Sequence, residues 1–270
     1  MAVPTTFYQQ LPPPPHLAEF VRYFWIAEGQ EITAPYHFSS VANGCAQLTF
    51  HYKGSFLSPG TDQVVPEFYL HGPSNKPTEI TTQENFGIIG VALYPYTASL
   101  LFHTSGQEVS NKVTVVQEVF GTGLRLLEEQ IATSASHQER MALLTQFLAE
   151  HLLQNKRSYT PLIKLIKAEI DAGQLPDADK LYEQLYLSRR QFERRFKDLL
   201  GFNPREYTKI QRFRYSLQRY QQDPDQSFTQ LALSSGYYDQ AHFNRDFKEY
   251  SGVTPTSYFS EDTQAQGLQL

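Results

Sequence analysis

The chain has 270 residues and a formal net charge of −5, and 40% of its residues are hydrophobic. This length is enough for one large domain or two ordinary ones with a full apolar core, so a small disulfide-stapled scaffold is excluded. The single Cys45 has no partner for an internal disulfide. No apolar run approaches the roughly 20 residues that cross a bilayer, and the start of the chain has no export signal. We therefore expect a soluble, cytoplasmic protein that does not interact with membranes.

Residues 1 to about 110 have the pattern of β-strands. Beta-branched and aromatic residues fill short runs that are bounded by Gly, Pro, Asn and Ser. The predicted strands cover residues 45–52, 68–70, 78–81 and 86–94. Just before them, apolar residues at helical spacing predict a short helix at one end of the sheet: Leu17, Phe20, Val21, Phe24 and Trp25.

From about residue 115 the apolar residues recur with the period of a helix. One stripe lies within residues 124–131 and a second within residues 141–152. The second stripe fits core packing and a homodimer contact equally well. The polar segment 154–159 then ends the pattern, which makes it the predicted linker, and Thr160 and Pro161 begin a new helix.

The charge is divided unevenly along the chain. Between Lys180 and Tyr220 there are eleven Lys and Arg against four Asp and Glu, a net charge of +7, so the remainder carries −12. An acidic body with a basic module is typical of a protein that docks on phosphate groups. A solvated charged helix surface explains the charge equally well, so the spacing of the residues has to separate the two interpretations.

The C-terminal part contains an internal repeat with an offset of 51 residues. Six residues recur in register, so that Phe192, Arg194, Phe196, Gly201, Pro204 and Tyr207 match Phe243, Arg245, Phe247, Gly252, Pro255 and Tyr258. Upstream the offset is 50, so the second copy carries one additional residue in its turn, at about Tyr238. Each copy is predicted to be a short helix, a tight turn and a second helix.

The second helix of each copy is predicted to have a buried apolar side and an outward polar side. Ser188 is the expected N-cap in the first copy and Asp239 in the second, and the repeated Phe residues face inward. A helix of about 10 Å diameter fits a major groove about 12 Å wide, and Gln, Asn and Arg match the edges of adenine and guanine. The predicted DNA-binding residues are Arg189, Arg190, Glu193, Arg194, Lys197, Gln240, Ala241, Asn244 and Arg245.

A connecting helix is predicted over residues 204–221, between Asn203 and Asp223. About 17 residues span roughly 26 Å, which would hold two recognition helices near the separation of about 34 Å between successive major grooves. The basic residues of this helix are candidate phosphate contacts: Arg205, Lys209 and Arg212.

These segments resemble a known family. The stretches LSRRQFERRFKDLLGFNPREY and LALSSGYYDQAHFNRDFKEYSGVTPTSY are similar to the two halves of the DNA-binding domain of AraC/XylS-type transcription regulators. The first copy departs from that family, because Tyr182 and Tyr186 stand where Ala and Gly are usual. More weakly, the stretch from LAEFVRYFW to VALYP resembles the β-rich sensory domain that often precedes this module, which implies a cupin-like sheet with trailing helices.

The sequence thus predicts an α+β fold with two domains. A β-rich, cupin-like domain for ligand sensing or dimerisation is expected over residues 1–155. The resemblance implies an AraC-type DNA-binding domain over residues 156–262, with helix-turn-helix units at about 175–200 and 227–250. We expect a sequence-specific bacterial transcription regulator that binds double-stranded DNA. Further candidate partners are a small-molecule effector, a second copy of the chain and RNA polymerase.

Aromatic residues of the β-rich domain are candidates for binding an effector, although core packing explains them as well. They are Trp25, Tyr52, Tyr69 and Tyr94.

Two other classes of function remain open. A metal-dependent cupin-type enzyme would need clustered His and carboxylate ligands, and the eight histidines contain no His-x-His pair. The sequence also lacks a phosphate-binding Gly loop and a nucleophile elbow, so no catalytic residue, metal or cofactor is expected. A helical protein-interaction module would not bind DNA. DNA binding is favoured over both, because a plain solvated surface has no reason to be repeated.

Overall fold

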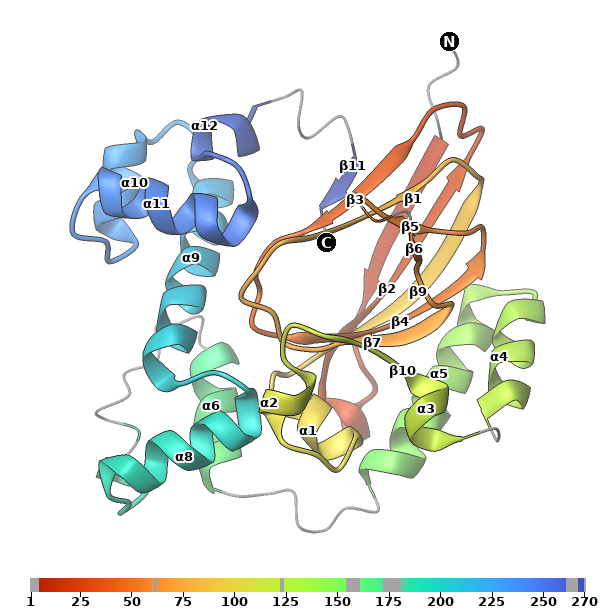
Figure 1. Cartoon of the computed structure of the whole chain (residues 1–270), viewed down its shortest axis with the longest axis horizontal. Coiled ribbons are helices and arrows are strands. Elements are labelled where there is room, and N and C mark those ends of the chain that lie inside the picture. The colour runs from red at the N-terminus through yellow and green to blue at the C-terminus, as the bar shows by residue number, and fades with distance from the viewer. Residues whose placement is uncertain are drawn as a thin grey trace.

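The computed structural model describes residues 5–59, 61, 63–121, 124–153, 161–171, 181, 183–260 and 267–269. Within these ranges a β-rich N-terminal module is followed by a helical C-terminal module (Figure 1). This arrangement confirms the expected α+β fold class. The predicted linker at 154–159 lies outside the described residues, as do the expected N-cap Thr160 and the family departure at Tyr182.

The N-terminal module contains two stacked sheets. Its strands are β1 (Thr5–Leu11), β2 (Val21–Gln30), β3 (Tyr36–Ser40), β4 (Ala46–Lys53), β5 (Leu57–Ser58), β6 (Gln63–Val64), β7 (Phe68–His71), β8 (Thr78–Thr82), β9 (Phe86–Leu93), β10 (Val113–Val115) and β11 (Gly267–Gln269). The first sheet has the order β1-β2-β9-β4-β7-β10 and the second the order β11-β3-β8-β5-β6. The pairings described are antiparallel apart from that of β11 with β3.

Both faces of the first sheet are buried at its centre. Along β2, Phe24 and Ile26 join the core beneath the helices, whereas Trp25 and Ala27 pack against the second sheet. The prediction of a helix over this stretch is wrong: the structure has a short 3-10 helix, η1 (Pro15–Leu17), followed directly by β2. A strand buried on both faces is continuously apolar, and a continuous apolar run contains helical spacings by necessity.

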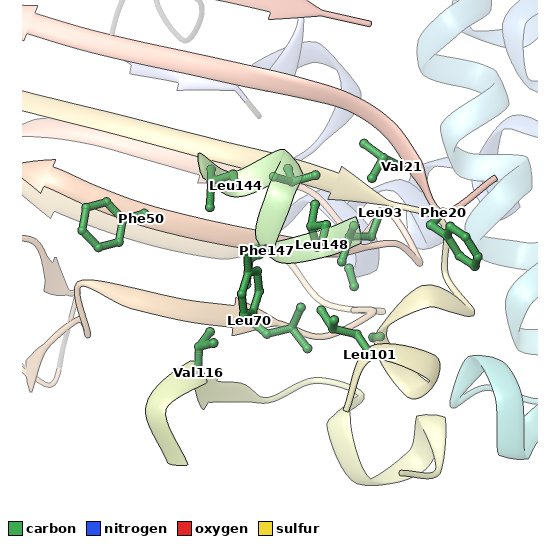
Figure 2. Close-up of a cluster of buried hydrophobic side chains, with 14 of the residues drawn as sticks. Phe20, Val21, Phe50, Leu70, Leu93, Leu101, Val116, Leu144, Phe147 and Leu148 are labelled. Carbon is green, nitrogen blue, oxygen red and sulfur yellow. The ribbon is translucent and has the colours of Figure 1, made fainter. Parts of the chain in front are cut away.

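The helices that follow β9 cover the outer face of the first sheet. They are α1 (Thr97–Leu101), α2 (Gly106–Val109), α3 (Val116–Phe120), α4 (Leu124–Thr133) and α5 (His137–Leu152). Figure 2 shows Leu144, Phe147 and Leu148 of α5 beside Leu70 and Leu93 of the sheet. The second apolar stripe is therefore part of the core of this chain, which confirms the first of its two interpretations.

The C-terminal module is built from helices around one apolar core. The helices are α6 (Pro161–Asp171), α8 (Arg189–Leu200), α9 (Pro204–Gln222), α10 (Phe228–Ser234), α11 (Gln240–Ser251) and α12 (Pro255–Tyr258). The two copies of the repeat have matching ends: Ser188 caps α8 and Asp239 caps α11, and both helices stop at a left-handed glycine. These are Gly201, with φ +87°, and Gly252, with φ +83°. The predicted repeat is confirmed at the level of backbone conformation.

The turns before α8 and α11 also correspond. Tyr186 has φ +52° and Gly236 has φ +80°, at positions related by the offset of 50. Tyr238 lies between this turn and the N-cap Asp239, where the additional residue is expected. The first copy thus places a tyrosine in a left-handed conformation that favours glycine, and its side chain is 97% exposed.

Replacing Tyr186 by glycine is expected to raise the free energy of unfolding by about 0.5–1 kcal/mol. A non-glycine residue in this region costs about 1–2 kcal/mol, and the greater freedom of glycine in the unfolded chain offsets part of the gain. Chemical denaturation measures the change. Tyr186→Ala is the matched control, because it removes the exposed ring and keeps the strained backbone. An equal gain from alanine would show that the ring, not the backbone, is the source.

Candidate nucleic-acid interface

The two predicted recognition helices lie at opposite ends of α9 (Figure 1). Phe192 and Phe196 of α8, like Phe243 and Phe247 of α11, are buried in the shared core. This packing fixes the outward side of each helix. Ten of the twelve predicted DNA-binding residues are exposed, either on the outward sides of α8 and α11 or on the first half of α9. They are Arg189, Arg190, Glu193, Arg194, Lys197, Arg205, Lys209, Ala241, Asn244 and Arg245.

The other two are partly buried and already have contacts. The Thr229 hydroxyl donates a 2.6 Å hydrogen bond to Oε1 of Gln240, which ties the start of α11 to α10. The guanidinium of Arg212 lies 5.4 Å from the centre of the Tyr237 ring, and its Nε is buried without a hydrogen bond. Arg212 therefore supports the second turn through a cation–π contact as well as lying on the predicted phosphate-binding helix.

The outward sides of the two helices differ in charge. Along α8, Arg190, Arg194 and Lys197 form no ion pair with any residue that the structure describes, whereas Arg189 pairs with Glu193 at 3.1 Å. Both members of that pair are about half exposed, so the pair contributes little stability and leaves Glu193 able to exchange partners. The outward side of α11 carries the amides of Gln240 and Asn244 and two exposed cations, Arg245 and Lys248. The outward side of the first copy is therefore the more cationic of the two, and the second copy adds amide donors and acceptors to its cations.

The end of α8 is docked on the N-terminal module. The Ser99 hydroxyl donates to the carbonyl of Leu199 at 3.0 Å, and Nε2 of Gln107 donates to Oδ1 of Asp198 at 3.2 Å. A Cβ on Gly106 would lie 2.5 Å from the backbone nitrogen of Gly201, so this approach requires glycine. Nothing in the sequence pattern indicated this contact, because it joins residues about 100 positions apart.

Two further contacts join the β-rich module to α9 and α11. Near the start of α9, Nδ2 of Asn75 donates to Oε1 of Glu206 at 2.5 Å. Near the end of α11, the carbonyl of Tyr250 accepts from the backbone nitrogen of Ala42 at 2.8 Å. The position of both recognition helices is therefore tied to the β-rich module.

A cavity of about 530 Å³ lies between the two sheets. Two of the four candidate effector-binding residues, Trp25 and Tyr69, line it together with Gln47, His71 and Glu79. Nε1 of Trp25 is buried without a hydrogen bond. Burial lowers the pKa of His71, so the ring is neutral at pH 7 and offers one donor and one acceptor. The cavity therefore combines aromatic walls with a few polar groups, as small-molecule sites do.

The polar lining could have been found in the sequence. Gln47 and Thr49 alternate with the apolar Leu48 and Phe50 along one predicted strand, which places both polar side chains on the same face.

The other two aromatic candidates do not line this cavity. The Tyr52 hydroxyl donates a 2.5 Å hydrogen bond to Oε1 of Glu28, beneath the guanidinium of Arg140. The Tyr94 hydroxyl donates to Oδ1 of Asp171 at 2.5 Å, which joins the end of β9 to α6. The structure thus brings together two of the four residues.

Across the described ranges, no three His, Cys, Asp or Glu side chains come together as metal ligands would. None of the helices within those ranges is long and apolar enough to span a membrane.

Two sequence families match the chain. Residues 9–114 match a domain of unknown function (DUF6597), and residues 181–261 match a helix-turn-helix domain. Among curated relatives, the HTH-type transcriptional regulator MtrA of Neisseria gonorrhoeae is 33% identical over 86 residues, which cover 32% of this chain and 28% of the relative. An uncharacterized HTH-type transcriptional regulator of Haemophilus influenzae is 33% identical over 109 residues, covering 39% and 34%. The matches thus span about a third of the length of these relatives.

Among solved structures, ToxT from Vibrio cholerae matches at 12% identity and a TM-score of 0.46, covering 95% of this chain and 98% of that one. The DNA-binding domain of AdpA, solved in complex with a target DNA, is 27% identical and covers 37% of this chain and 90% of its own, with a TM-score of 0.32. The family match, the two relatives and the repeated units agree that residues 181–261 of this chain form a helix-turn-helix domain.

Proposed function

We propose that the chain is a sequence-specific transcription regulator, without enzymatic activity, that binds duplex DNA through two helices in successive major grooves. The observation that carries this proposal is the duplicated outward side of α8 and α11, which is exposed in both copies. The relatives that match this part of the chain are named as transcriptional regulators, which supports the same function.

The geometry of α9 supports simultaneous binding of both helices. Its 19 residues extend for roughly 28 Å at 1.5 Å per residue. Helices held apart by this length would reach major grooves about one turn of B-DNA apart. Arg194 and Arg245, at equivalent positions of the repeat, are the proposed contacts to guanine, and Arg190, Glu193 and Asn244 lie beside them on the same sides. Arg205 and Lys209 would contact phosphate groups between the two grooves.

Selection of bound sites from random duplex DNA with the purified full chain tests the proposal. We expect an enriched motif of two short boxes about ten base pairs apart. Retention on heparin without any enriched motif would show that the basic side binds polyanions only. The absence of binding at low salt would favour a protein-interaction module instead.

We further propose that the cavity between the sheets binds a planar, largely apolar effector. Its volume of about 530 Å³ suits a small organic molecule, and the buried indole nitrogen of Trp25 would donate to an acceptor of the ligand. Four other points stay predictions from the sequence. They are the domain boundaries at 1–155 and 156–262, a cytoplasmic location, homodimerisation and contact with RNA polymerase.

Occupation of this cavity is expected to change the fluorescence of the chain, because Trp25 is its single tryptophan. The probe is 1-anilinonaphthalene-8-sulfonate, a largely apolar aromatic dye that accepts energy from tryptophan. We expect saturable quenching of Trp25 with a matching rise in dye emission.

Ser40→Phe is the matched variant, since Ser40 lines the cavity from β3 and a phenyl ring would fill the space. It should abolish the energy transfer. Equal transfer in the variant would place the dye elsewhere and contradict binding between the sheets.

A further inference from the structure

Two arginines from different modules converge on Cys45 at the junction between the modules. Arg22 belongs to β2, and its Nη1 lies 3.5 Å from Sγ of Cys45. Arg214 belongs to α9, and its Nη1 lies 3.8 Å from the same sulfur. The two nitrogens are therefore within about 7 Å of each other. None of these three residues lines the cavity between the sheets.

Neither arginine has a carboxylate partner among the residues that the structure describes. The Cys45 thiol, a weak acceptor, is shared by both, and Arg214 also donates to Oε1 of Gln211 at 3.2 Å. Both guanidiniums are partly buried, in a setting less polar than water, where like charges repel more strongly. The junction as it stands therefore holds two positive charges together without a negative charge to balance them.

Two more donors at this junction lack a partner. The hydroxyl of Tyr207 and Nε2 of Gln211 form no hydrogen bond with the part of the chain that the structure describes, although Tyr207 is 1% exposed and Gln211 is 9% exposed. A Cβ on Gly44, which precedes Cys45 and has φ +61°, would lie 3.3 Å from the Tyr207 ring and 3.4 Å from Nε2 of Gln211. Burial raises the pKa of Tyr207, and Arg214 and Arg22 oppose that rise, as neighbouring cations do. All four donors thus gather beside the Gly44–Cys45 backbone.

A cluster of four donors whose described acceptors are a thiol and one amide oxygen is complementary to an anion. We propose that the junction binds a small oxyanion, in particular the carboxylate group of an organic acid, between Arg22 of the β-rich module and Arg214 of α9. Oxygen atoms of the anion would accept from both guanidiniums and from the unpartnered Tyr207 hydroxyl.

The anion would stabilise the docked arrangement of the two modules. Its donors come from both sides of the junction, so it binds the docked state more tightly than an undocked one. Since docking also fixes the ends of α8 and α9, an organic acid at this site would change the geometry of the DNA-binding helices.

The experiment measures thermal unfolding of the full chain while sodium acetate, or inorganic phosphate, replaces sodium chloride at constant ionic strength. We expect a saturable rise in Tm for the wild type. Arg22→Met and Arg214→Met, which keep an unbranched apolar stem and remove one charge, should lose this rise. The control Arg125→Met changes an exposed arginine of α4 and should keep it.

A further comparison separates a binding site from a packing role. In chloride alone, Arg214→Met should be at least as stable as the wild type, because one of two repelling charges is gone. Tyr207→Phe removes the unpartnered hydroxyl and keeps the ring, so it should weaken acetate binding several-fold in calorimetric titration.

An equal rise in Tm for the wild type, Arg22→Met and Arg214→Met would reveal a general salt effect and overturn the proposal. A response to phosphate without one to acetate would assign the site to inorganic oxyanions and overturn the organic-acid assignment. These measurements use no DNA, so their outcome is independent of the proposed regulator function.

Discussion

Replacing Arg194 and Arg245 together by alanine is expected to weaken binding to the selected DNA site by the sum of the two single effects in free energy. Each arginine that reads a guanine contributes about 1–3 kcal/mol to discrimination, so the double variant should lose about 2–6 kcal/mol. Electrophoretic mobility shift titrations at fixed salt measure this loss for the wild type, the two single variants and the double variant.

Additivity is expected because the two residues share no partner. They lie on helices at opposite ends of α9, and effects of substitutions so far apart usually add. If only one helix entered the DNA, the second substitution would have no effect. Arg125→Ala, an exposed arginine on α4, is the control and should leave affinity unchanged.

The same titrations identify what each arginine contacts. A loss of affinity that is confined to the preferred DNA sequence indicates a base contact. A loss of equal size on all sequences, with a salt dependence reduced by about one counterion, indicates a phosphate contact and would contradict the proposed role of that arginine.

The parts of this fold that were predictable from sequence are those fixed by local chemistry. Capping residues such as Ser188 and Asp239 set the start of a helix through a side-chain bond to the backbone three positions on, which a sequence displays directly. The repeat added a second, independent copy of each signal. Strand β2 was mistaken for a helix because its apolar faces are buried by two different layers, a fact that belongs to the assembled sheets and not to the segment.

The features that sequence reasoning missed depend on contacts between distant segments. Gly106 sits in a short helix with no motif, yet its missing side chain lets α8 rest on α2. The cluster around Cys45 joins residues that are 23 and 169 positions apart. No periodicity or spacing rule relates such residues, because chain topology alone brings them together.

Replacing Gly201 by alanine is expected to destabilise the chain far more than the same change at Gly252. Both glycines end a recognition helix in the left-handed conformation, so alanine costs about 1–2 kcal/mol at either position through backbone strain. Among the described residues, a Cβ at Gly252 would have only Pro77 nearby, at an ordinary 3.4 Å. At Gly201 it would lie 1.6 Å from Oγ of Ser110 and 2.6 Å from the carbonyl oxygen of Gly106.

The Ser110 side chain can rotate away, but the Gly106 carbonyl is backbone, so α2 and α8 must separate. For Gly201→Ala we expect the free energy of unfolding to fall by a further amount of about 1–3 kcal/mol, which is typical of overpacking. Chemical denaturation measures this change. Ser110→Ala in that background should recover little, because the backbone clash remains. Hydrogen exchange should accelerate at the α2 amides in Gly201→Ala and stay unchanged in Gly252→Ala. Equal losses of unfolding free energy in the two variants would mean that the β-rich module and the first recognition helix do not touch in solution.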